Sequence, residues 1–176
     1  ILGIMILIAL CADFLADYEA DAIQQNMTER LLPPQAGHIF GTDALGRDMF
    51  ARIIFGARIS LFVGLVTVVV SLTFGLIIGA CAGYFGGAVD SILMRIMDVF
   101  LAIPQTLMAI TIVAALGGGI VNLLIALSIS SIPRFSRVVR SSILSVKGQE
   151  FVEAARACGT NNARIIFKHI LPNARG

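Results

Sequence analysis

Long uncharged apolar runs alternate with polar segments along this chain. Residues 1–12, 59–89 and 99–133 contain no Asp, Glu, Lys or Arg. About 20 residues of α-helix cross the roughly 30 Å hydrocarbon core of a bilayer. The run 59–89 is therefore long enough for one membrane span, whereas 99–133 is too long for a single crossing. The run 1–12 is too short, and it predicts the end of a first span.

Glycine clusters divide these runs into separate helices. Gly83–Gly87 predicts a turn after a span over Ile59–Gly83, and Gly117–Gly119 predicts the turn of a tight helical hairpin. The first arm of this hairpin would start near Ala88, and the second would run from about Ile120 to Val139. We expect Pro104 and Pro133 to kink the two arms, because proline is tolerated within membrane helices.

The pattern predicts an all-α, polytopic transmembrane bundle with about four spans. We expect a fragment, cut within a first membrane span and again after a cytoplasmic segment. Its predicted parts are the end of the first span (1–16), an extracytoplasmic loop with an interfacial helix (17–58), three further spans (59–140) and a cytoplasmic segment (141–176).

The polar segment before the second run predicts a loop with some short helix, interrupted at Pro33-Pro34. We expect Thr42 or Asp43 to cap the start of an interfacial helix. The i,i+4 spacing of Asp43 with Arg47, and of Asp48 with Arg52, predicts ion pairs that support this helix.

Composition makes a soluble protein untenable. The chain has 176 residues, of which 57% are hydrophobic and 14% are charged, whereas soluble domains are about 45–50% apolar and about 25% charged. A soluble enzyme of this size could not bury so much apolar surface. The net charge of +2 does not point to nucleic acid, and the three cysteines show no metal-ligand spacing.

Basic residues set the expected orientation. The segment 134–176 carries eight of the 13 Lys and Arg residues, namely Arg134, Arg137, Arg140, Lys147, Arg156, Arg164, Lys168 and Arg175. Basic residues are enriched on the cytoplasmic side of a membrane, so this segment is predicted to lie inside and the acidic loop outside. We expect the arginines at the end of the last span to snorkel to the headgroups. For Asp90, Arg95 and Asp98 we expect a solvated or paired structural role.

One segment has the glycine spacing of a phosphate-binding loop. In Gly41–Asp48, however, Arg47 stands in place of the lysine and Asp48 in place of the hydroxyl that would ligate Mg²⁺. A carboxylate at that position repels phosphate. The chain is therefore not expected to hydrolyse ATP, and we predict no metal site and no enzymatic activity.

The segment 150–173 predicts two short helices joined by a turn. An alanine-rich helix would end at Gly159, and Thr160 or Asn161 would cap the second helix. The second helix would end near Pro172, with an apolar side made of Ile165, Ile166, Phe167 and Ile170. The residues alone leave two interpretations open: a docking surface for another protein, or an amphipathic helix on the lipid surface.

The same segment resembles the EAA motif of ABC importer permeases. Glu153-Ala154-Ala155, three residues, Gly159, and the later Leu171-Pro172 match that motif in register, while His169 occupies its usual isoleucine position. Four further segments resemble one branch of this family, the C-type permease subunits of type I importers for dipeptides, oligopeptides and nickel. These segments are Gly41–Asp48, Gly56–Leu61, Ala82–Gly87 and Met94–Asp98.

The resemblance implies a transmembrane permease with six spans and a cytoplasmic coupling helix in the bacterial inner membrane. Glu153, Ala154, Ala155 and Gly159 would dock in an ATP-binding subunit, and Leu171 and Pro172 would lead back to the membrane. The implied partners are a second permease subunit, two ATP-binding subunits that hold ATP and Mg²⁺, and an extracytoplasmic solute-binding protein. The implied solutes are di- or oligopeptides, or nickel.

Three other functions are possible for a membrane protein with these features. A secondary carrier needs acidic residues for ion coupling near the centres of its spans, and the uncharged runs contain none. An intramembrane enzyme needs a Ser/His or His/Glu constellation at membrane depth, whereas His38 and His169 lie outside the predicted spans. A non-transporting membrane scaffold remains an alternative that the sequence does not separate from a permease.

Overall fold

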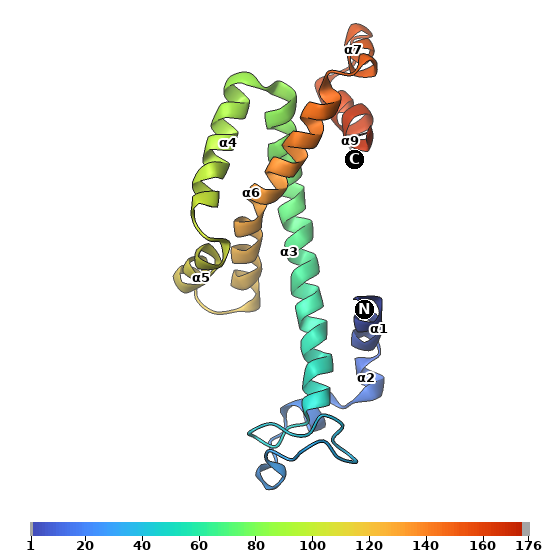
Figure 1. Cartoon of the computed structure of the whole chain (residues 1–176), viewed down its shortest axis with the longest axis vertical. Coiled ribbons are helices and arrows are strands. Elements are labelled where there is room, and N and C mark those ends of the chain that lie inside the picture. The colour runs from blue at the N-terminus through green and yellow to red at the C-terminus, as the bar shows by residue number, and fades with distance from the viewer. Residues whose placement is uncertain (1, 174–176) are drawn as a thin grey trace. The chain divides into compact units, whose positions relative to one another are not determined.

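The computed structural model describes residues 2–173 and is all-α, as predicted. Ile1 and residues 174–176, which fall in the predicted first span and the predicted cytoplasmic segment, lie outside the described residues. The chain divides into two compact units, Ile1–Leu65 and Val66–Gly176, and Figure 1 shows their elements along the chain.

The first unit combines short helices with a folded loop. Helices α1 (Leu2–Leu10) and α2 (Ala12–Leu15) are followed by a π-helical turn, Tyr18–Ile23, and a 3₁₀ turn, Met27–Glu29. A small apolar cluster holds the unit together, and it consists of Ala12, Ala22, Ala51, Ile54 and Phe55. The uncharged run at the start of the chain is thus helical, as expected for the end of a span.

Helix α3 (Met49–Phe85) is longer than the sequence predicted. It has 37 residues and begins ten positions before Ile59. The side chain of Asp48 caps its first turn, because the backbone N–H of Ala51 donates to Asp48 Oδ1 at 2.9 Å. The prediction of a cap at Thr42 or Asp43 was therefore wrong.

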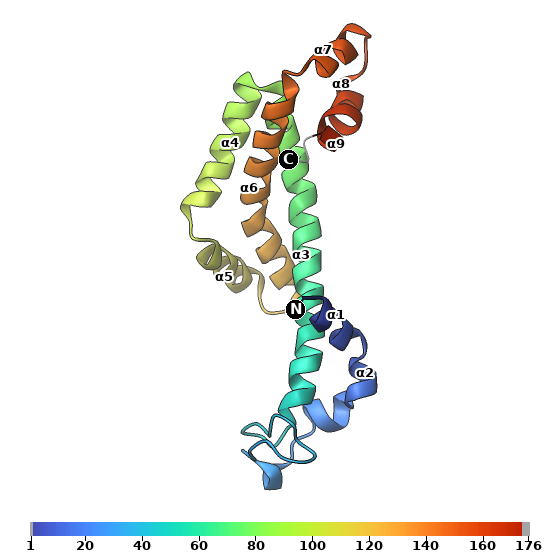
Figure 2. The same cartoon turned by 45° about the vertical axis from the view of Figure 1, so that its right-hand side comes forward.

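The second unit contains three further long elements. Helices α4 (Gly87–Ala102) and α6 (Ile120–Lys147) run alongside each other in Figures 1 and 2, and α5 (Gln105–Leu116) lies against the first half of α6. The turn predicted at Gly117–Gly119 is confirmed, whereas the turn predicted over Gly83–Gly87 is confined to Gly86, because α3 continues to Phe85 and α4 begins at Gly87. Pro133 stays buried inside α6, which continues to Lys147.

The first arm of the predicted hairpin is broken. Helices α4 and α5 are bent by 87° at the break between them. Ile103 is extended (φ −94°, ψ 128°), the conformation that proline imposes on the preceding residue. The kink expected at Pro104 is thus a complete break, because Pro104 is the N-cap of a new helix, α5.

One helix among residues 2–173, α3, is long and apolar enough to cross a membrane. The number rises to two if the bent pair α4 and α5 is counted as one span.

Backbone contact between α3 and α6 rests on three glycines spaced four residues apart. A Cβ added at Gly75 would lie 2.5 Å from Phe135 Cβ, one at Gly79 would lie 2.5 Å from the Ser136 carbonyl oxygen, and one at Gly83 would lie 2.9 Å from Ile143 Cβ. Small residues at this spacing let two membrane helices approach closely. Ser71 continues the row, and its buried hydroxyl donates to the Ser128 carbonyl at 3.0 Å.

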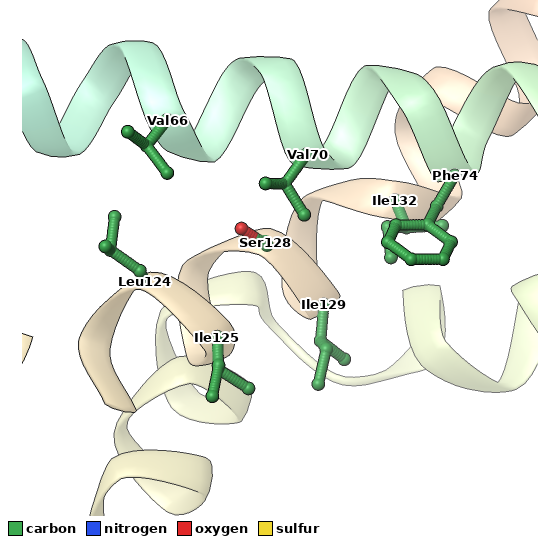
Figure 3. A pocket seen from close by; sticks show the side chains of 8 residues that line it. All are labelled: Val66, Val70, Phe74, Leu124, Ile125, Ser128, Ile129 and Ile132. Carbon is green, nitrogen blue, oxygen red and sulfur yellow. The ribbon is translucent and has the colours of Figure 1, made fainter. Parts of the chain in front are cut away.

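Beyond these glycines the two helices leave an apolar groove of about 230 Å³. Figure 3 shows side chains of α3 and α6 facing each other across it, with Ser128 the one polar side chain drawn. Its lining consists of Val66, Val70, Phe74, Leu124, Ile125, Ser128, Ile129 and Ile132.

Candidate functional site

The segment 150–173 folds as two helical arms around a left-handed turn. The first arm is α7 (Glu150–Ala157), and Gly159 follows it with φ +72°. The N–H of Gly159 donates to the Arg156 carbonyl at 2.9 Å, and the N–H of Thr160 donates to the Ala155 carbonyl at 3.1 Å. This pair of bonds is a Schellman motif, so the predicted end of the helix at Gly159 is confirmed.

The second arm consists of α8 (Asn162–Arg164), a π-helical stretch, Ile165–Ile170, and α9 (Leu171–Asn173). Asn161 caps it, since its Oδ1 accepts from the Ala163 N–H at 3.2 Å. Of the two predicted caps, Thr160 and Asn161, the structure therefore uses Asn161. The arm is helical as far as Asn173, the last residue that the structure describes, so the predicted end near Pro172 stays a prediction.

The two arms are anchored on α3 and α6 by a common apolar cluster. Three residues of the predicted apolar side, Ile165, Ile166 and Ile170, are buried, whereas the fourth, Phe167, is 60% exposed. The buried members of this coupling-segment cluster are Ala80, Tyr84, Ile143, Val146, Val152, Ile165, Ile166 and Ile170. The anchoring fixes which face of the first arm remains free.

The residues that match the EAA motif lie mostly on that free face. Glu153, Ala154 and Gly159 are exposed, and Ala155 is half-buried where it packs on the coupling-segment cluster. Leu171 also packs against the cluster, and Pro172 is exposed. The motif residues on this face therefore form a short ridge of alanine and glycine with the Glu153 carboxylate, which a partner protein can approach closely, and the same arm also exposes Glu150, Phe151 and Arg156.

Tyr84, a residue without a predicted role, joins both arms to the end of α3. Its hydroxyl donates to Asn162 Oδ1 at 2.7 Å, and the Arg156 guanidinium lies 5.1 Å from the centre of its ring. Tyr84 and Asn162 are 78 positions apart, so no local pattern pointed to this contact. The four-residue spacing of Gly75, Gly79 and Gly83, by contrast, is a sequence signal for the close approach of two membrane helices.

Two ion pairs join α4 to α6 next to this segment. Arg140 makes a two-pronged contact with Asp90, whose Oδ2 accepts from Nη2 at 2.6 Å, and Arg137 contacts Asp98. The pairing expected for Asp90 and Asp98 is confirmed. Arg137 and Arg140 accordingly bind carboxylates of α4, where the sequence predicted contact with headgroups.

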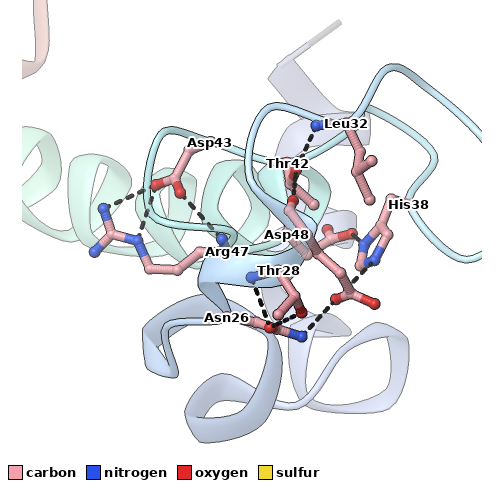
Figure 4. A network of polar contacts seen from close by, with 9 residues as sticks. Asn26, Thr28, Leu32, His38, Thr42, Asp43, Arg47 and Asp48 are labelled. Carbon is pink, nitrogen blue, oxygen red and sulfur yellow. Dashed lines mark hydrogen bonds and ion pairs between the residues drawn. The ribbon is translucent and has the colours of Figure 1, made fainter.

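A second polar network holds the loop of the first unit (Figure 4). Asp43 Oδ1 accepts from the backbone N–H groups of Leu45 and Arg47, and Arg47 and Arg52 contact Asp43 Oδ2. Burial alone would raise the pKa of Asp43, but these donors outweigh it and lower the pKa to about 2. The predicted pair of Asp43 with Arg47 is present in a turn without the interfacial helix, and Arg52 pairs with Asp43 instead of Asp48.

His38 links two carboxylates within this loop. Its Nδ1 lies 2.7 Å from Asp48 Oδ2, and its Nε2 lies 3.6 Å from Glu29 Oε2. The hydrogen bond with Asp48, together with the charges of Asp48 and Glu29, outweighs partial desolvation and raises the pKa of His38 above its ordinary value of 6.5. Among residues 2–173 no group of three or more His, Cys, Asp or Glu side chains is placed to hold a metal ion.

The loop should lose protection as pH rises. A raised pKa in the folded state means that His38 contributes its full stabilisation below pH 6.5, and that the contribution disappears as pH rises through the folded-state value. Hydrogen exchange of residues 26–48 in the full-length protein, followed from about pH 5.5 to about pH 8.5, measures this effect after correction for intrinsic exchange rates. His38→Gln should remove the dependence, and an unchanged profile in that variant would assign it to another group.

The chain is similar to known transport proteins along most of its length. A family model described as "Binding-protein-dependent transport system inner membrane component" matches residues 71–176. The chain is 48% identical over 169 residues to the dipeptide transport system permease protein DppC of Alkalihalophilus pseudofirmus. The matched region covers 96% of this chain and 55% of that protein. It is 40% identical over 176 residues to the oligopeptide transport system permease protein OppC of Bacillus subtilis, covering 100% of this chain and 57% of that protein.

A third relative is named for a different solute, glutathione. The glutathione transport system permease protein GsiD of Pectobacterium atrosepticum is 42% identical over 173 residues, covering 97% of this chain and 56% of that protein. The chain spans about half the length of the curated relatives it matches. These three relatives are all named as permease proteins of transport systems, in agreement with the prediction of a transport component. The predicted resemblance is therefore confirmed, and the chain belongs to the family of inner membrane components of binding-protein-dependent transport systems.

Proposed function

We propose that this chain is part of the permease subunit of an ATP-binding-cassette importer for di- or oligopeptides. The observation that carries the proposal is similarity along almost the whole chain to permeases named for dipeptide and oligopeptide transport. The subunit would form half of a translocation pathway, and a second permease subunit would form the other half. Membership of a binding-protein-dependent family supports this function over a secondary carrier or a scaffold.

The proposed topology has four of six spans within this chain. The first span ends within 1–16, and 17–58 is the extracytoplasmic loop. Three further spans lie in 59–140, formed by α3, by α4 with α5, and by α6. The segment 141–176 is cytoplasmic. The excess of basic residues after position 133 supports this orientation.

The first arm of the segment 150–173 would be the coupling helix. Its exposed Glu153 and Ala154, with Ala155 and Gly159, would dock in a groove of an ATP-binding subunit, and Leu171 and Pro172 would lead the chain back to the membrane. The apolar cluster under the arms supports this role, because a rigidly anchored helix transmits the movement of a docked subunit to α3 and α6.

The proposal assigns ATP and Mg²⁺ to two partner subunits. It also includes an extracytoplasmic solute-binding protein and a multi-pass position in the bacterial inner membrane, with lipid around the spans. The family description itself refers to a binding protein and to the inner membrane. No nucleic acid partner is proposed.

Docking can be tested with a bulky side chain on the exposed ridge. Ala154→Phe in the full-length permease should reduce co-purification of the ATP-binding subunits, measured by mass spectrometry, because the ring prevents close approach to the backbone of α7. Ala163→Phe is the matched control, since Ala163 is equally exposed but lies on the second arm.

Two outcomes decide the docking proposal. Loss of the ATP-binding subunits with Ala154→Phe but not with Ala163→Phe supports docking through the first arm. Equal recovery of these subunits from wild type and both variants would move docking elsewhere, and their absence from wild type would count against the importer itself.

A further inference from the structure

We infer that Tyr84 is a positioning residue that sets the angle between the two arms of the segment 150–173. Its side chain is the point where the end of α3 meets both arms. The hydroxyl reaches Asn162, the first residue of α8, and the ring lies under the guanidinium of Arg156 on α7. One residue therefore touches the chain on either side of the turn at Gly159.

Burial makes the hydroxyl contact specific. Tyr84 is 5% exposed, and its ring belongs to the coupling-segment cluster with Ile143, Val152 and Ile165. A buried phenol that lacks a partner loses its bond to water without replacement. The second arm is therefore held where Asn162 Oδ1 can accept a hydrogen bond from the Tyr84 hydroxyl. Rotation of that arm about Gly159 would break the bond.

Packing alone does not account for this side chain. The cluster needs the apolar ring, which phenylalanine would supply with the same shape, and the edge-to-face contact with Phe85, at 5.3 Å between ring centres, also needs only the ring. The hydroxyl adds a single directional bond, and that bond goes to the arm beyond the turn. The Arg156 contact adds a cation–π attraction from the arm before it.

The consequence for transport rests on the proposed function. If an ATP-binding subunit moves α7, the ring and hydroxyl of Tyr84 carry that movement into the last turn of α3, so both arms and α3 move together. Without the hydroxyl, the second arm gains freedom while the docking ridge at Glu153 and Ala154 is unchanged. ATP hydrolysis would then continue with less peptide imported for each ATP.

The test compares Tyr84→Phe, Asn162→Ala and the double variant in the full-length permease. Tyr18→Phe is the matched control, because Tyr18 is the other tyrosine of the chain and its side chain is exposed. The first measurement is hydrogen exchange of residues 160–166, which does not depend on transport. Loss of one hydrogen bond should speed exchange there by about two- to tenfold, with little further change in the double variant.

The second measurement is uptake of radiolabelled alanyl-alanine per ATP hydrolysed, in proteoliposomes that contain the complete importer and its binding protein. We expect Tyr84→Phe to lower this ratio while recovery of the ATP-binding subunits stays normal. Unchanged exchange in Tyr84→Phe, or additive effects in the double variant, would overturn the positioning role. Faster exchange with an unchanged uptake ratio would overturn its part in coupling, and a wild type that neither binds ATP-binding subunits nor imports peptide would overturn the proposed function instead.

Discussion

Replacing Gly79 by leucine is expected to prevent α3 and α6 from packing. A Cβ at this position would lie 2.5 Å from the Ser136 carbonyl oxygen and 2.8 Å from Val139 Cβ. Neither atom belongs to a flexible side-chain end, so the helices themselves must separate. Overpacking of well-packed interiors costs about 1–3 kcal/mol, and a clash with backbone should cost about 3 kcal/mol or more. Thermal unfolding of the full-length permease in detergent measures the loss.

Gly64→Leu on the same helix is the control. No atom lies within 4 Å of a Cβ added at Gly64, and leucine is a better helix former than glycine by up to about 1 kcal/mol. We therefore expect unchanged or slightly higher stability from this variant. If both substitutions lowered the unfolding temperature equally, the close approach at Gly79 would not be what holds α3 to α6.

Gly159→Val is expected to uncouple ATP hydrolysis from peptide uptake. Gly159 adopts φ +72°, a conformation that costs an ordinary L-residue about 1–2 kcal/mol and a β-branched residue more. Relief of that strain would open the Schellman turn and turn the second arm away from Tyr84. Uptake should fall by about tenfold or more, while ATP hydrolysis by the assembled importer continues.

The controls separate backbone conformation from side-chain size. Gly148→Val places the same side chain at the other end of α7, where φ is −90° and no atom lies within 4 Å of an added Cβ. Gly159→Asn should retain most uptake, because asparagine tolerates the left-handed conformation. Normal uptake by Gly159→Val, with hydrolysis also normal, would show that the left-handed turn is not needed for coupling.

Features that depend on neighbouring residues could be predicted from the sequence. The end of α7 at Gly159 and the cap at Asn161 follow from backbone conformation and from hydrogen bonds between residues two to five positions apart. The long apolar helices and the glycine turns follow from composition in the same way. These features are decided locally, so the rest of the fold does not change them.

Features that depend on competition or on distant contacts could not be predicted. Thr42, Asp43 and Asp48 are all residue types that favour a helix N-cap. Which of them caps α3 depends on which carboxylate pairs with Arg47 and Arg52, and both arginines pair with Asp43. The i,i+4 spacing of Asp43 and Arg47 suits a tight turn as well as a helix. The contact of Tyr84 with Asn162 joins residues that only the folded chain brings together.

The break between α4 and α5 indicates whether this part of the protein faces lipid, protein or water. The last carbonyl groups of α4 lose their usual partners there, because Pro104 has no N–H to donate and Ile103 is extended. Hydrocarbon offers no hydrogen bonds to such groups, and irregular backbone at membrane depth occurs only beside protein or water. In the proposed topology the break therefore points away from lipid. Ile103 and Leu107, which are 47% and 56% exposed, then form a dry contact surface for another protein segment or an apolar patch beside water.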